Sequence, residues 1–111
     1  MTDTPIGLGQ SAFVNYQPRH PLQSRQEIGR RLRATREALE AKSGAMAEMV
    51  GVTKQAWSQY EAGNRRPDLT PMLAFSDRFN ISLDWIYKGN PAQLPYTLAN
   101  KIAEALAAMP D

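Results

Sequence analysis

The sequence predicts an all-α protein, for three reasons. Apolar residues recur at helical spacing through most of the chain after residue 24. Residue types that start or stop helices stand between these periodic segments. No segment shows the strict alternation of apolar and polar residues that predicts a half-buried strand. At 111 residues the chain suits one compact domain with tails.

The first segment, residues 1–22, is expected to be a flexible arm. It mixes prolines and glycines with polar residues, so neither a helical nor a strand period is sustained. Scattered apolar residues leave open a partial docking of this arm on the body or on a partner. A first helix then begins with Ser24 as N-cap and Glu27 three residues later, which is the spacing of a capping box. It ends near Ala41.

The helix that begins at Ser24 has an apolar face that consists of Ile28, Leu32, Thr35 and Leu39. Three further helices follow at short intervals. The second helix opens at Ser43-Gly44, turns Met46, Ala47 and Val50 inward, and stops at Gly51, a residue able to take positive φ. Thr53 caps the third helix, in which Trp57 and Tyr60 are expected to be buried and which closes at Gly63. Asp68 caps the fourth, with Pro71 in its first turn and with Leu69, Met72, Leu73, Ser76 and Phe79 inward.

The last two helices are shorter or more uniform in composition. Asn80 is the expected left-handed stop of the fourth helix, and Ser82 caps a short fifth helix that ends at Gly89-Asn90-Pro91. This fifth helix contains Leu83, Trp85 and Ile86. The alanine-rich segment from Tyr96 to Ala108 places a narrow apolar stripe on Leu98, Ile102, Ala105, Leu106 and Met109.

Composition excludes several classes of function. The chain has no cysteine and a lone histidine, His20, so neither a disulfide framework nor a thiolate or histidine metal site is expected, and no cofactor. A cysteine nucleophile, a histidine dyad, a phosphate-binding glycine loop and paired carboxylates in a pocket-forming context are all missing, so an enzyme is not expected. Neither a secretion signal nor an 18-residue apolar run is present, which favours a cytoplasmic protein without a membrane role.

Charge is distributed unevenly along the chain. Ten of the 13 Lys and Arg residues lie between Arg19 and Arg66, together with only five of the 11 Asp and Glu residues. Clustered arginines are typical of a surface that faces phosphates. Solvated helix faces produce the same pattern, so both interpretations stay open.

The segment from Met46 to Gly63 has the features of two helices joined by a sharp turn. Ala47 is small enough for two helices to approach closely, Gly51 permits the turn, and Val52 fills the corner. Thr53 caps the following helix. A helix mounted in this way can enter the DNA major groove with its N-terminal end first, where side chains of its first two turns meet base edges.

On these residues the chain resembles the Cro and lambda-type repressor family of helix-turn-helix regulators, also called the XRE family. The matching blocks are Ile28 to Arg33 with Arg36, Met46 to Thr53, Trp57 to Pro67, and Asn80 to Ile86. The resemblance covers Ile28 to Gly89. It implies a five-helix, lambda-repressor-like helix-turn-helix domain at residues 23–90, after the arm and before an extra C-terminal helix at residues 91–111.

The resemblance implies that the helix from Thr53 to Ala62 is the recognition helix. Its candidate base contacts are Lys54, Gln55, Ala56, Ser58 and Gln59. A glutamine amide can bind adenine at N6 and N7, lysine prefers guanine, and Ala56 can touch a thymine methyl group. The alternative is that Gln55 and Gln59 are merely solvated. Trp57 and Tyr60 fit the core better than a stacking role, since they lie opposite the polar face.

Other positions are expected to meet the DNA backbone or to brace the fold. The candidate backbone contacts are Lys42, Ser43, Thr53, Asn64, Arg65 and Arg66. Arg36 and Glu61 stand where the family often has an ion pair between helices one and three; an exposed Arg36 that contacts phosphate is the alternative.

The chain departs from the family at Ser43, where many relatives have a phosphate-binding glutamine. Gly44 weakens the second helix by about 1 kcal/mol relative to alanine.

The function that the resemblance implies is sequence-specific binding of double-stranded DNA as a transcriptional regulator. A repressor that acts as a homodimer on an inverted repeat is expected, because one small module seldom makes enough contacts. The candidate dimer residues are Trp85, Ile86, Leu98, Ile102 and Leu106; alternatively, the last helix folds back over the core.

A different function is an antitoxin or co-regulator whose arm or C-terminal helix binds a partner protein. A further idea is that Arg19-His20 enters the minor groove.

Overall fold

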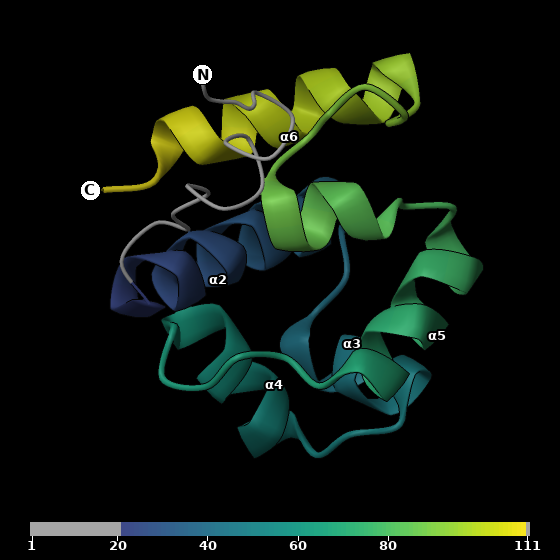
Figure 1. Ribbon diagram of the computed structural model, residues 1–111. Coiled ribbons are helices and arrows are strands. Elements are labelled where there is room, and N and C mark those ends of the chain that lie inside the picture. Colours follow the sequence, from purple (N-terminus) through teal and green to yellow (C-terminus); the bar gives the residue numbers. More distant parts are fainter. Residues whose placement is uncertain (1–20, 111) are drawn as a thin grey trace, which may run out of the picture.

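The computed structural model describes residues 21–110, and this part of the chain consists of helices joined by short turns (Figure 1). The helical segments are α2 (Pro21–Ala38), α3 (Ser43–Val50), α4 (Lys54–Ala62), α5 (Leu69–Phe79), the π-helix η1 (Asp84–Lys88) and α6 (Tyr96–Ala108). The described residues contain no strand. The prediction of an all-α fold is therefore confirmed.

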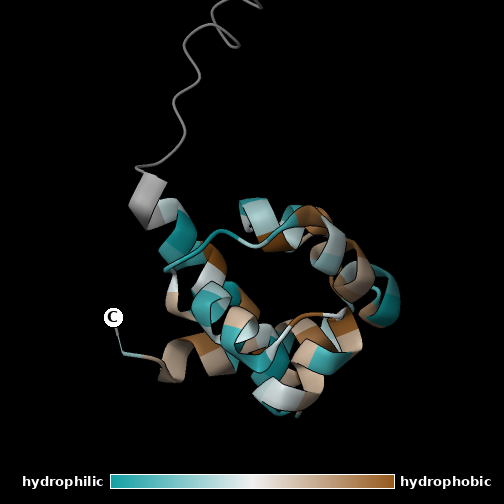
Figure 2. Ribbon diagram, turned by 90° about the horizontal axis from the view of Figure 1, so that it is seen from below, coloured by the Kyte–Doolittle hydropathy of each residue, from teal (hydrophilic) through white to brown (hydrophobic). Residues whose placement is uncertain are grey.

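Helix α2 lies at the centre of the arrangement. It packs against α4 on one side and against α6 and η1 on the other, while α3 packs against α4 and α5 (Figure 1). Along each helix hydrophobic and hydrophilic residues are interspersed, as amphipathic helices require (Figure 2). The largest fully buried side chains are Trp57, Tyr60, Phe75, Leu32, Met46, Met72, Ile81, Ile86, Ile102 and Thr35. They come from all of these helices or from the turns between them and form one core.

The first helix begins earlier than the capping box predicts. Its first residue is Pro21, so Ser24 lies inside the helix and the expectation that Ser24 is the N-cap is wrong. Proline suits the first position of a helix because its φ is already helical and its missing N–H would have no partner there. The helix ends at Ala38, and Glu40 takes a left-handed conformation in the turn that follows.

The second and third helices agree closely with the sequence prediction. Met46, Ala47 and Val50 are buried in α3, which ends at Gly51 with a φ of 80°. Thr53 is the N-cap of α4, and its Oγ1 accepts a hydrogen bond of 3.0 Å from the amide of Ala56. These local features are confirmed.

Helix α5 presents a different face to the core from the one predicted. Pro71, Met72 and Phe75 are buried, whereas Leu69 and Leu73 are 56% and 43% exposed. The prediction that both leucines point inward is wrong. The reason is tertiary, because α5 is apolar on two sides and the side that meets α3 and the ring of Trp57 is the one that carries Phe75.

The fifth segment is a π-helix. The hydroxyl of Ser82 accepts a hydrogen bond of 3.0 Å from the amide of Trp85, so Ser82 caps this segment as expected, and Gly89 ends it in the left-handed region. Trp85 and Ile86 are both buried. In α6, Ile102 is buried and the rest of the predicted stripe packs partly against the core.

Some expectations concern residues beyond the described range. The arm up to residue 20, including Arg19-His20, lies outside it. Between residues 21 and 110, no helix has the length and the apolar character needed to cross a membrane.

Candidate nucleic-acid interface

Helix α4 stands on the core through one side and turns its other side to solvent. Trp57 and Tyr60 are fully buried, and their rings meet edge to face with centroids 6.3 Å apart. Lys54, Gln55 and Ser58 are exposed on the opposite side. Ala56 and Gln59 are partly buried and so lie at the border of the exposed side. The first two turns of α4 therefore offer a polar surface to any large partner.

The start of α3 lies next to the start of α4. A Cβ atom built on Gly44 would be 3.8 Å from Cδ of Lys54, which is an ordinary van der Waals contact. Lys42 precedes α3 and is exposed, and Ser43 is partly buried. The contact of Gly44 with Lys54 thus brings the start of α3 close to the start of α4, although the two residues are ten positions apart in the sequence.

The loop after α4 supplies further basic groups. Asn64, Arg65 and Arg66 are all exposed. Arg65 is already engaged, since its Nη2 lies 2.7 Å from Oδ2 of Asp68 and its guanidinium lies 5.5 Å from the ring centroid of Tyr60. Arg66 forms no ion pair with any residue between 21 and 110, and the same holds for Lys42 and Lys54. Lys54 on the polar side of α4 and Lys42 and Arg66 on its flanks are therefore positive charges without an ion-pair partner among residues 21–110.

An ion pair ties α4 to α2. Nε and Nη2 of Arg36 donate to the two carboxylate oxygens of Glu61 at 2.6 and 3.1 Å, and the Nε1 of Trp57 donates to the same carboxylate. Both charged side chains are largely buried, at 13% and 11% exposure. The hydrogen bond to Glu61 raises the pKa of Arg36 above its usual value against the opposing effect of burial. Arg36 is therefore held inside the fold and is not displayed to a phosphate.

Of the five residues expected to form a dimer interface, three are buried and two are partly buried. Trp85, Ile86 and Ile102 are buried, and Nε1 of Trp85 donates to Oγ1 of Thr35 at 2.9 Å. Leu98 and Leu106 pack partly against the core because α6 folds back over α2. Trp85, Ile86 and Ile102 thus offer almost no surface to a second copy, whereas Leu98 and Leu106 keep some, and the assignment of these residues to a dimer interface stays a prediction.

Two residues that position the site were missed by the sequence analysis. Gly29 lies where α2 meets α4, and an added Cβ would be 2.5 Å from the carbonyl oxygen of Glu61. Its one sequence signal is a glycine in the middle of an otherwise regular helix. Asp68 was expected to cap α5, but its side chain makes no capping hydrogen bond and binds Arg65 instead. The three-residue spacing of Arg65 and Asp68 is a weak signal for that pair.

Within the described range, no group of three or more His, Cys, Asp or Glu side chains is arranged to hold a metal ion. The site is an exposed, polar and basic surface made of one helix and its two flanks. A surface of this kind suits a macromolecule with an anionic backbone.

Comparison with known protein families agrees with this geometry. Residues 27–111 match the family model described as a helix-turn-helix domain. The chain belongs to the helix-turn-helix family. The resemblance to Cro and lambda-type regulators that the sequence motifs indicated is thereby confirmed.

Two relatives illustrate this helix-turn-helix membership. The chain is 34% identical over 66 residues to an HTH-type transcriptional regulator, YonR, of the SPbeta prophage in Bacillus subtilis (strain 168). It is 37% identical over 68 residues to repressor protein C2 of Salmonella phage P22. These matches cover 60% and 61% of this chain, but 61% of the first relative and 32% of the second. The chain thus spans less than two thirds of either relative. No solved structure gives a significant match.

Proposed function

We propose that this chain is a sequence-specific DNA-binding transcriptional regulator that inserts α4 into the major groove. One observation carries the proposal: Lys54, Gln55 and Ser58 form an exposed polar row on a helix whose opposite side is locked in the core. Because one side of α4 is buried in the core and its polar side faces solvent, its first turns can enter a major groove.

The residues of this row have the chemistry for reading bases. Gln55 can donate to and accept from one adenine edge, and Lys54 can donate to guanine O6 and N7. Gln59 and Ala56 lie at the border of this row and are partly exposed. Gln59 can add a hydrogen bond to a base, and Ala56 can add a contact with a thymine methyl group. We assign base recognition to these residues together with Ser58.

The flanking residues have the chemistry for holding phosphates. Lys42, Ser43 and Thr53 lie at the start of α3 and α4, and Asn64 and Arg66 follow the end of α4. Contacts at both ends of α4 would set its position along the groove without specifying sequence. Arg65 would contribute only after it leaves Asp68, so Arg66 is the stronger candidate in this loop.

We further propose that the regulator is a repressor and binds as a homodimer. The similarity to a phage protein named a repressor supports the first part. The small number of side chains on α4 supports the second, because two copies on an inverted repeat double the contacts. Leu69 and Leu73 are the dimer contact we now favour, since they are exposed apolar neighbours on α5, directly after the loop of Arg66. Contact through α5 would leave both copies of α4 free to face one duplex.

The test is selection of bound sites from random duplexes with purified protein, followed by titration at several salt concentrations. Gln55→Ala should reduce the preference for particular base pairs. Arg66→Ala should weaken binding to all duplexes alike and reduce the slope of log affinity against log salt concentration by about 0.9. Lys101→Ala is the charge-matched control, because this lysine lies on α6, across α2 from α4. Failure to bind any duplex at low ionic strength, or equal loss on operator and random DNA for Gln55→Ala, would reject the assignment.

The homodimer has its own test. Leu73→Ser should shift the protein toward monomer in sedimentation equilibrium and weaken operator binding, with no effect on the base preferences. Tyr96→Ser is the matched control, since Tyr96 is an exposed large apolar side chain on α6. An unchanged association constant for Leu73→Ser would place the dimer contact elsewhere.

A further inference from the structure

A second concave site lies away from α4. It is a pocket of about 370 Å³ where α2, η1 and α6 meet, and it is lined mainly by Glu27, Arg30, Arg31, Trp85, Lys88 and Leu106. Helix α4 contacts α2 on its other side, so none of the residues assigned to DNA recognition lines this pocket (Figure 1). The volume is within the range of small-ligand sites.

The charges around this pocket are mainly positive. Arg30, Arg31 and Lys88 line it, against the single carboxylate of Glu27. Lys88 is exposed and makes no ion pair with the described residues. The excess of cationic groups creates a local potential that attracts anions.

The guanidinium of Arg31 is held by several hydrogen bonds, and that of Arg30 by one. Nε and Nη2 of Arg31 donate to the carbonyl oxygens of Trp85 and Ile86 at 2.9 to 3.2 Å, and its guanidinium lies 5.9 Å from the centroid of the Trp85 ring. Nη1 of Arg30 donates to the carbonyl oxygen of Pro110 at 2.6 Å. A guanidinium has five N–H donors, so this one bond leaves Arg30 able to bind a further acceptor. Fixed donors cost less entropy when a ligand binds.

The walls of the pocket are chemically mixed. Trp85 and Leu106 supply apolar surface beside the cationic rim. A ligand with an anionic head and an apolar or aromatic body would meet complementary groups at both of its ends.

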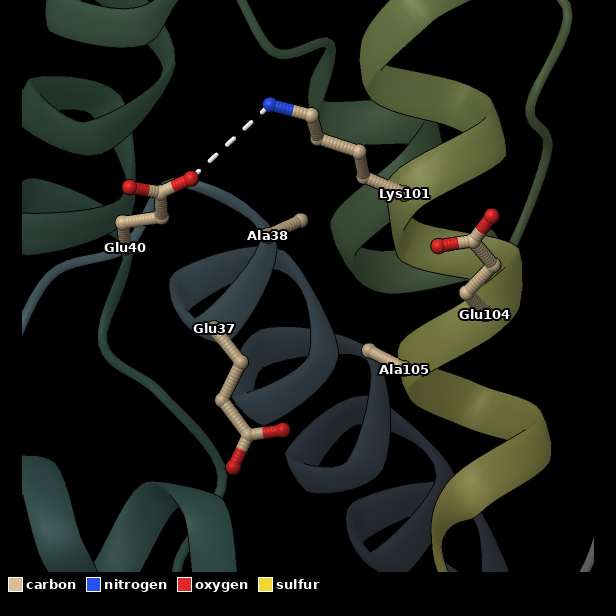
Figure 3. A pocket seen from close by; sticks show the side chains of 6 residues that line it. All are labelled: Glu37, Ala38, Glu40, Lys101, Glu104 and Ala105. Atoms are coloured by element: carbon tan, nitrogen blue, oxygen red, sulfur yellow. Dashed lines mark ion pairs between the residues drawn. The ribbon is translucent and has the colours of Figure 1, made fainter.

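The other end of the α2 and α6 pair has the opposite charge. There a pocket of about 400 Å³ is lined by Glu37, Glu40 and Glu104 around Lys101. Figure 3 shows the ammonium of Lys101 directed toward Glu40, at 3.9 Å. An anion would be repelled at this acidic end, so Lys101 provides a control for any effect of Lys88.

From these observations we propose that the pocket between α2, η1 and α6 is a binding site for a small organic anion with a carboxylate or phosphate head. Arg30 and Lys88 bind the head, Arg31 adds a fixed positive charge, and Trp85 and Leu106 contact the body. The proposal stands independently of DNA binding, because it uses no residue of α3 or α4.

The experiment is a titration of the whole chain with three probes: phenyl phosphate, benzoate and neutral benzyl alcohol. Binding is monitored through the NMR resonance of the Trp85 indole N–H. The buried indole N–H of Trp57 serves as an internal reference. The two anions should give saturable shifts at Trp85, and their relative affinities identify whether the phosphate or the carboxylate head is preferred. Benzyl alcohol should give none.

Variants separate this site from general charge attraction. Lys88→Ala and Arg30→Ala should each raise the dissociation constant about five-fold, as expected for the loss of one solvent-accessible ion pair. Lys101→Ala should leave it within twofold, and all three variants should keep the thermal midpoint of the parent. No saturable shift at Trp85, an equal response to benzyl alcohol, or equal affinities in Lys88→Ala and the parent would each overturn the proposal.

Discussion

Gly29 of α2 lies directly against the carbonyl oxygen of Glu61 in α4. A Cβ atom at position 29 would be 2.5 Å from that oxygen and 2.6 Å from the carbonyl oxygen of Tyr60. Real Cβ atoms essentially never come this close to another heavy atom, and both neighbours are backbone. The absence of a side chain at Gly29 is therefore what lets the proposed recognition helix sit so close to α2.

Gly29→Ala should accordingly destabilise the protein. Alanine favours an isolated helix over glycine, but here the overpacking should win and lower the free energy of unfolding by about 2 kcal/mol. Urea denaturation measures the change. A variant as stable as the parent would mean that α2 and α4 can separate without cost.

Gly44→Ala should have the opposite effect. A Cβ atom at this position meets nothing closer than Cδ of Lys54 at 3.8 Å, so the fold has room for it. The gain in helix propensity should raise the free energy of unfolding by about 0.5 to 1 kcal/mol. Thermal denaturation of this variant beside Gly29→Ala compares the same substitution in two surroundings, and a loss of stability for Gly44→Ala would contradict the open packing.

Glu61→Gln should reveal how much the buried ion pair contributes to the free energy of unfolding. The amide keeps the shape of the carboxylate but leaves the positive charge of Arg36 with only the more exposed carboxylate of Glu37, 4.0 Å away, at a cost of about 3 kcal/mol. Replacing both residues, Arg36→Met with Glu61→Leu, should recover part of this loss because no uncompensated charge then remains. Chemical denaturation of the two variants gives the comparison. A double variant less stable than Glu61→Gln would show that the hydrogen bonds matter more than the charges.

Asp68→Asn should increase binding to DNA of any sequence. Asp68 now pairs with Arg65 at 2.7 Å, and without that charge Arg65 becomes available to a phosphate. If it makes one such contact, the slope of log affinity against log salt should steepen by about 0.9. Asp84→Asn is the control, because Asp84 is also an exposed carboxylate and lies on η1. Equal slopes in the two variants would exclude Arg65 from the DNA contacts.

Stability should fall at alkaline pH, in part through Tyr87. Burial raises the pKa of Tyr87 above its ordinary value, and its hydroxyl donates to the carbonyl oxygen of Pro67 at 3.2 Å. Above about pH 10 the unfolded chain releases this proton more readily than the folded chain, so stability present below that pH is lost as the pH rises. Tyr87→Phe should flatten the dependence between about pH 9.5 and 11, whereas Tyr96→Phe, at an exposed position, should not. An unchanged profile in Tyr87→Phe would attribute the loss to other groups, of which Tyr60 is the first candidate because burial raises its pKa as well.

The helix-turn-helix itself was predictable from short stretches of sequence. The Thr53 cap, the left-handed Gly51 and the burial of Trp57 and Tyr60 all follow from residues within a few positions of one another. The assignment of Lys54, Gln55 and Ser58 to base recognition stays a prediction, since their exposure is necessary for that role but does not establish it.

Other features depended on contacts between distant parts of the chain. The burial of Phe75 in place of Leu69 and Leu73 follows from the docking of α5 on α3 and Trp57. The burial of Trp85 and Ile86 follows from the docking of η1 on α2, and that of Ile102 from the return of α6 over α2.

The sequence alone determined the all-α class, the turn between α3 and α4, and the family, because caps, turns and helical periodicity are set by neighbouring residues. The tertiary structure alone decided which apolar side of α5 is covered, why position 29 must lack a side chain, and which partner Asp68 takes. The physical reason is that an amphipathic pattern shows that a helix buries a face, whereas the partner of that face is selected by the packing of the whole core.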